Sequence, residues 1–97
     1  MNNINKYSNK DIAFKKAKDF LGINVNIKVS DKPSKKYMVL NPQTGKWVYF
    51  GQIGYQDFTK TGNLTKRDNY LKRSANIKGD WKNNKYSPNN LSRNILW

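Results

Sequence analysis

The residues of this 97-residue chain that could do chemistry are basic and aromatic side chains, which alternate through its middle. Aromatic rings can stack on unpaired bases, and lysine or arginine side chains can contact phosphates. Seven basic residues are therefore candidates for binding a polyanion: Lys35, Lys36, Lys46, Lys66, Arg67, Lys72 and Arg73. Four aromatic residues are candidates for stacking or for an interface: Trp47, Tyr49, Tyr55 and Phe58. The alternative is that most of these rings build the core, because aromatic residues supply much of the apolar mass of the chain.

The acidic residues offer little for catalysis. All six are Asp, and the chain has no Glu, Cys or His, which excludes a thiolate or imidazole zinc site and a Ser-His or Cys-His nucleophile pair. Asp11 and Asp68 follow helix-start signals, and Asp31 and Asp80 lie in turn contexts. Asp57, in a glycine-punctuated stretch, is best interpreted as a turn residue that caps nearby backbone amides. We therefore expect a protein that is not an enzyme, with no metal, cofactor or small-molecule substrate.

The net charge of +13 indicates an anionic partner. Part of the lysine excess is explained by A/T-rich coding, since Asn is also abundant, but the shortage of acids is not. The charge is divided almost evenly between the two halves of the chain, so it does not form a basic tail. With only three arginines, bidentate recognition of guanine is poorly provided for, and any nucleic-acid binding should be weakly sequence-specific. No apolar stretch is long enough to span a membrane.

The hydrophobic pattern predicts the elements that must position these side chains. Apolar residues at helical spacing predict an amphipathic helix over residues 9–21, capped by Ser8. Alternation predicts a strand over residues 23–29, and residues 37–50 predict a hairpin whose five-residue connection is 41–45. A second helix should begin at Thr65 and end at Gly79, and a short last helix should begin at Ser87. The expected fold class is α+β, with a small antiparallel sheet of about three strands, including a hairpin, packed with two to three short helices.

Several blocks of the chain together resemble a known family. They are residues 35–42 (KKYMVLNP), 45–51 (GKWVYFG), 54–59 (GYQDFT), 69–73 (NYLKR), 77–81 (IKGDW) and 86–91 (YSPNNL), with the ending LW. This pattern resembles a family of small, basic, uncharacterised proteins of nucleocytoplasmic large DNA viruses, the giant viruses. The resemblance covers about residues 35–97 and implies a role in virus assembly or genome packaging, with no catalytic residues to carry over. It divides the chain into an N-terminal arm, 1–8, and a single basic domain, 9–97, in which 9–34 is an extension and 35–97 the family-like core.

Two functional hypotheses follow. The first is a non-enzymatic virion structural protein, a minor capsid or cement-type component that binds acidic capsid or other virion proteins. It would be found in the virion and, during assembly, in the virus factory of the host cytoplasm. The alternative is a protein that binds viral DNA or RNA by contacting phosphates. Positive charge gathered in one groove with exposed aromatic rings would favour nucleic acid, whereas dispersed charge, flat apolar patches and a splayed arm would favour assembly.

Overall fold

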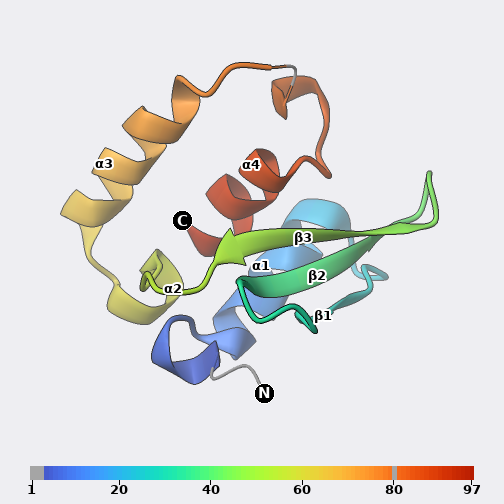
Figure 1. Cartoon of the computed structure of the whole chain (residues 1–97), viewed down its shortest axis with the longest axis horizontal. Helices are drawn as coiled ribbons and strands as arrows, with labels where there is room; N and C mark the ends of the chain where they lie inside the picture. Colours follow the sequence, from blue (N-terminus) through green and yellow to red (C-terminus); the bar gives the residue numbers. More distant parts are fainter. Residues whose placement is uncertain (1–3, 80) are drawn as a thin grey trace.

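The computed structural model of the chain describes residues 4–79 and 81–97, and it shows a three-stranded antiparallel sheet packed with short helices. The strands lie in sequence order, so that β2 is central (Figure 1). The expected α+β class is confirmed. The elements are η1 (Ile4–Lys6), α1 (Lys10–Leu21), β1 (Ile27–Val29), β2 (Lys35–Asn41), β3 (Lys46–Gln52), α2 (Phe58–Thr61), α3 (Leu64–Ala75), η2 (Trp81–Asn83), α4 (Pro88–Leu91) and η3 (Ser92–Leu96).

Helix α1 covers one face of the sheet because its small apolar residues allow close packing. Ala13 and Ala17 are both fully buried. Its N-cap is Asn9, whose side chain accepts a hydrogen bond from the backbone N–H of Ile12, at 3.2 Å. The prediction that Ser8 caps this helix is therefore wrong by one residue, because the Ser8 hydroxyl is buried among side chains elsewhere.

The hairpin is longer than its sequence pattern indicates, and the first strand is shorter. Strands β2 and β3 pair from Lys35 opposite Gln52 to Asn41 opposite Lys46. In the stretch 23–29, only Ile27–Val29 forms a strand, and it pairs with β2. Residues 23–26 share the alternating sequence pattern but do not form a strand, and Ile23 is 76% exposed.

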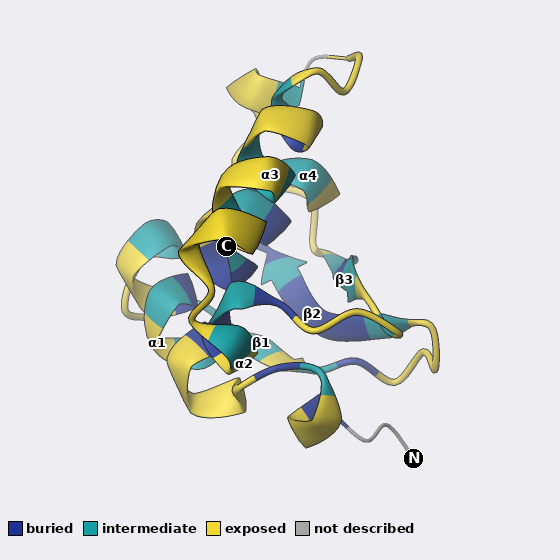
Figure 2. Ribbon diagram, turned by 90° about the vertical axis from the view of Figure 1, so that its left-hand side faces the viewer, coloured by how far each residue is buried: buried dark blue, intermediate teal, exposed yellow. Residues whose placement is uncertain are grey.

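The core lies between one face of the sheet and the helices (Figure 2). Tyr37 and Phe50 are partners across β2 and β3, and their ring centroids lie 5.9 Å apart. Phe14 of α1 meets the Tyr37 ring edge-on at 6.0 Å. Leu91, Ile95 and Leu96 close this core from the C-terminal helices, whereas no described helix covers the opposite face of the sheet. Because the helices pack on one face only, alternate side chains of β3 point to the face that no described helix covers.

The N-terminal segment does not form a free arm over residues 4–8. Ile4 is 7% exposed and belongs to the core, and the Tyr7 carbonyl accepts a hydrogen bond from the Asp57 backbone N–H at 3.0 Å. The expectation of an arm over residues 1–8 is therefore wrong for this part, because a buried apolar side chain anchors it. Residues 1–3 lie outside the described part of the chain, as does Asp80.

The C-terminal half is held together by polar side chains. Helix α3 begins after Asn63, whose side chain accepts from the Lys66 N–H, so the predicted start at Thr65 is also slightly too late. The helix ends at Ala75 rather than near Gly79.

Ser87 caps α4 as predicted, and α4 continues directly into the π-helix η3. Arg93 of η3 donates from Nη1 to the Leu71 carbonyl at 2.7 Å, which joins η3 to α3.

A buried ion pair joins β2 to the turn before α2. The Lys36 Nζ and an Asp57 carboxylate oxygen lie 3.2 Å apart, and the two side chains are 3% and 0% exposed. Burial lowers the pKa of Lys36, although the Asp57 charge opposes this shift. The same carboxylate caps α2 by accepting from the Thr59 N–H and hydroxyl, which confirms the interpretation of Asp57 as a turn cap.

Hydroxyl groups extend this network to the N-terminal segment. The Tyr37 hydroxyl donates to Ser8 Oγ at 2.7 Å, and the Ser8 and Thr59 hydroxyl oxygens lie 3.0 Å apart. The Asn9 N–H donates to the Thr59 hydroxyl oxygen at 2.9 Å. Burial raises the pKa of Tyr37 to about 12, so this phenol donates over the whole neutral range. The network therefore joins β2, α2 and the start of α1.

Replacing Asp57 should destabilise the fold more than replacing both members of the ion pair. Asp57→Asn leaves the buried Lys36 ammonium without its counter-charge, and we expect a loss of about 3–5 kcal/mol in the free energy of unfolding. Lys36→Met with Asp57→Asn removes the unpaired charge, so the double variant should be more stable than Asp57→Asn alone. Urea unfolding of the two variants and the parent measures both effects. A double variant no more stable than Asp57→Asn would contradict the assignment.

Candidate functional site

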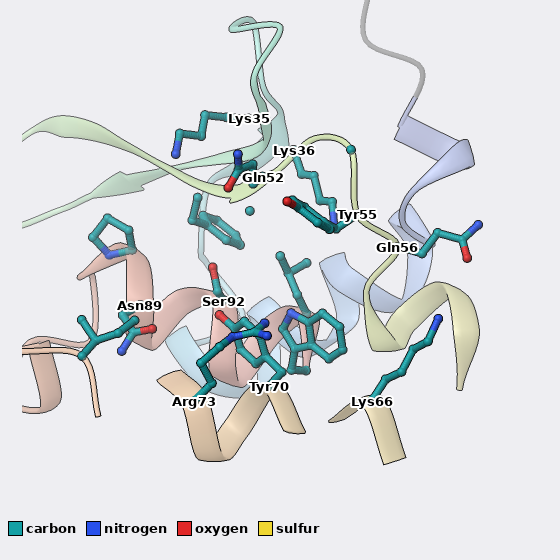
Figure 3. Close-up of a pocket in the computed structure, with 17 residues that line it drawn as sticks. Lys35, Lys36, Gln52, Tyr55, Gln56, Lys66, Tyr70, Arg73, Asn89 and Ser92 are labelled. Carbon is teal, nitrogen blue, oxygen red and sulfur yellow. The ribbon is translucent and has the colours of Figure 1, made fainter. Parts of the chain in front are cut away.

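A groove of about 860 Å³ lies between the end of the hairpin and α3. Figure 3 shows its two walls: Gln52 and Tyr55 lie on one side, and Tyr70 and Arg73 rise from α3 on the other. The buried side chains of Phe50 and Leu96 also line it. The groove thus joins the hairpin, α3 and η3, which are far apart in the sequence.

The charged side chains that line this groove are basic. Lys35 comes from β2, and Lys66 and Arg73 come from α3. Lys36 also borders it, but its charge is directed to Asp57. No acidic residue is among the described residues that line the groove. The described charged side chains around the groove are therefore cations, which favours an anionic ligand.

An aromatic stack forms part of the α3 wall. The rings of Tyr70 and Trp97 are stacked with centroids 4.5 Å apart and an interplanar angle of 14°. The Arg73 guanidinium carbon lies 5.8 Å from the Tyr70 ring centroid. Burial raises the pKa of Tyr70, although its hydrogen bond with Ser92 and two nearby arginine charges oppose the rise. These contacts fix Tyr70 before any ligand binds.

The opposite wall carries an aromatic ring without such support. Tyr55 follows Gly54 in the turn after β3, and it is 66% exposed. It is the only aromatic residue among the large hydrophobic side chains that the described structure leaves exposed. Exposure of a ring beside a cationic groove is typical of a binding surface rather than of a core.

Arg67 and Phe58 support the groove and do not line it. The Arg67 Nε donates to the Trp97 main-chain oxygen at 2.7 Å. Its guanidinium carbon also lies 5.6 Å from the Phe58 ring centroid. Arg67 is therefore committed to holding Trp97 in place, and Phe58 packs beneath that arginine.

The structure thus separates the sequence candidates. Lys35, Lys66, Arg73 and Tyr55 come together at the groove. Lys36 is corrected to a structural residue, because it is only 2% exposed and paired with a carboxylate. Lys46 and Lys72 are exposed but do not line the groove, and Figure 1 shows the hairpin turn beside Lys46 on the side away from α3.

Trp47 and Tyr49 lie on a different surface, the sheet face that the helices do not cover. The Lys28 Nζ lies 4.7 Å from the Trp47 ring centroid, and the Lys32 Nζ lies 4.1 Å from that of Tyr49. The Tyr49 hydroxyl also donates to Asp31 at 2.8 Å. Lysines of the protein itself therefore already occupy positions over these two rings.

Sequence reasoning missed Tyr70 and Trp97. A signal for Tyr70 was present, since Lys66, Tyr70 and Arg73 are spaced four and three residues apart and share one face of a helix. No local signal places Trp97, because its position depends on the path of η3 and on Arg67. The π-helical geometry of η3 was also unforeseen, and such turns often occur at functional sites.

The described carboxylates do not gather. Asp57 is buried in its ion pair, Asp31 accepts from Tyr49, and no group of three potential metal ligands occurs within 4–79 and 81–97. Within the same residues, no helix has both the length and the apolar character needed to cross a membrane.

Gly51 shapes the groove, and its substitution should show this. Its φ is +77°, and a Cβ there would lie 2.7 Å from the Leu96 Cδ1. Gly45 has a similar φ of +71° with nothing within 4 Å of a Cβ, so it is a matched control. We expect Gly45→Ala to cost about 1–2 kcal/mol from the backbone alone, and Gly51→Ala to cost at least about 1 kcal/mol more. Equal urea midpoints for the two variants would contradict the close approach of Leu96 to Gly51.

Comparison with known proteins gives a family without an assigned activity. No curated protein and no solved structure matches the chain. The model of a family of unknown function, DUF5754, matches residues 25–74, just over half of the chain. The match includes β1, which the sequence-based division placed in an extension, and stops before the C-terminal helices. The match includes the groove residues Lys35, Tyr55, Lys66, Tyr70 and Arg73, whereas Trp97 lies outside it. The chain therefore belongs to the DUF5754 family, whose function is unknown.

Proposed function

We propose that this chain is a non-enzymatic nucleic-acid-binding protein that contacts phosphates in the groove with weak sequence specificity. One observation carries the proposal: Lys35, Lys66 and Arg73 share a groove with Tyr55, Tyr70 and Trp97, and no described acidic residue lines it. Cations alone would suit any polyanion. Aromatic rings beside them favour a ligand that has both phosphates and planar bases.

The charge of the whole protein supports the same ligand. A net charge of +13 attracts polyanions over long distances. The basic side chains of the groove can then contact the phosphates of such a ligand directly. In this proposal Lys35, Lys66 and Arg73 contact phosphates and do not recognise base edges. Arg73 already lies beside the Tyr70 ring, which leaves little scope for bidentate recognition of guanine.

The virion hypothesis ranks second. A minor capsid or cement-type role stays a prediction from the resemblance to proteins of large DNA viruses. Residues 4–8 pack onto the domain and do not form the splayed arm expected of a protein that cements larger subunits. The concentration of cations and rings in one groove is the feature that we expected of a nucleic-acid-binding protein.

Charge reversal in the groove should weaken binding more than the same reversal elsewhere. We compare Lys66→Glu/Arg73→Glu with Lys46→Glu/Lys72→Glu, since both pairs change the net charge equally and all four side chains are exposed. The groove pair should weaken binding of a labelled oligonucleotide at least tenfold more than the control pair. It should also reduce the slope of log affinity against log salt by about 0.7 for each lost phosphate contact.

Fluorescence anisotropy from about 50 to 200 mM salt measures both quantities. Polyglutamate serves as a competitor that carries charge without bases. Equal losses in the two pairs would place the binding on the general surface. Competition by polyglutamate as strong as that by the oligonucleotide would favour an acidic protein partner instead.

A further inference from the structure

We infer that the groove selects a single unpaired strand over a duplex and holds a base against Tyr55. The inference rests on the proposed function, because it names the class of nucleic acid that the same groove would take. Two features carry the inference: the small size of the groove, and an aromatic ring in it that has no stacking partner among the described residues.

The groove is open to a strand but too small for a duplex. Its volume of about 860 Å³ lies within the range of pockets that enclose small molecules, which is of the order of one or two nucleotides. Its two walls come from the hairpin side and from α3, so a ligand must enter between them (Figure 3). A duplex presents phosphates on its outside and keeps its bases stacked inside. Only its backbone could reach the basic rim, and the aromatic walls would stay unused.

The free ring is Tyr55. On the α3 wall, Tyr70 is already stacked on Trp97, so that ring has its partner in the protein itself. Tyr55 has a large exposed area on the opposite wall. Figure 3 shows its ring at the upper edge of the cavity, across from Tyr70. An unpaired base can be turned out of its strand and stacked on such a ring, which a paired base cannot do without opening the duplex.

The apolar and amide groups of the groove fit the same ligand. Ile77 lines the groove and is 51% exposed, which provides an apolar surface for a ring. The amides of Gln52 and Asn89 also line it. Asn89 donates to the Ser74 carbonyl at 3.1 Å, which fixes that amide beside the cavity. In this arrangement the basic side chains of Lys35, Lys66 and Arg73 contact the backbone that enters between the walls.

The test separates stacking from charge. Binding of a short labelled oligothymidine and of a blunt duplex of the same length is measured for the parent, Tyr55→Ala and Tyr55→Phe. We expect the parent to bind the single strand at least tenfold more tightly than the duplex. Tyr55→Ala should weaken single-strand binding by about 5- to 150-fold, the range that corresponds to one lost base stack. Its salt slope and its duplex binding should match those of the parent, and Tyr55→Phe should bind like the parent.

Other outcomes have separate meanings. If the parent binds both probes equally and Tyr55→Ala has no effect, the inference is overturned while the proposed function stands. If neither probe binds at about 50 mM salt, the proposed function itself fails. If Trp47→Ala/Tyr49→Ala weakens single-strand binding and Tyr55→Ala does not, the base lies on the uncovered sheet face and the inference is again overturned. Because Tyr55 is exposed, circular dichroism and urea unfolding of Tyr55→Ala should match the parent.

Discussion

The ion pair of Lys36 and Asp57 is the interaction on which the rest of the structure depends. A buried charge is tolerated only when it has a counter-charge and hydrogen bonds, and these two residues provide both for each other. Asp57 also caps α2, and its backbone N–H holds the Tyr7 carbonyl. One residue therefore links the segment around Tyr7, the central strand and the turn that leads to α3.

This ion pair also separates the roles of the lysines on β2. Neighbouring lysines on β2 have opposite roles, since Lys36 is neutralised in the interior while Lys35 lines the groove. The turn that ends at Asp57 carries Tyr55 to the rim, and the helix after α2 carries Lys66, Tyr70 and Arg73 to the other wall. The buried network thus holds the segments on both sides of the groove in place, and its member Lys36 also borders the groove.

The starts of the two main helices show that local sequence rules predict a helix but not its exact first residue. Both main helices were predicted, yet their caps are Asn9 and Asn63 rather than Ser8 and Thr65. Each of these positions offers two good capping residues within a short span, and propensity alone does not choose between them. Burial made the choice at the first helix, because the Ser8 hydroxyl forms hydrogen bonds with Tyr37 and Thr59.

The sequence by itself determined the α+β class, the hairpin, the excess of positive charge and the set of residues from which a site could be built. These features follow from periodicity and composition, which are local or additive. Only the tertiary structure decided that Lys36 is buried, that Arg67 holds Trp97 and that Tyr55 is left exposed. The contacts of Lys36 with Asp57 and of Arg67 with Trp97 join residues that are far apart in the sequence. A side chain's burial, exposure and partners are set by which segments fold against it.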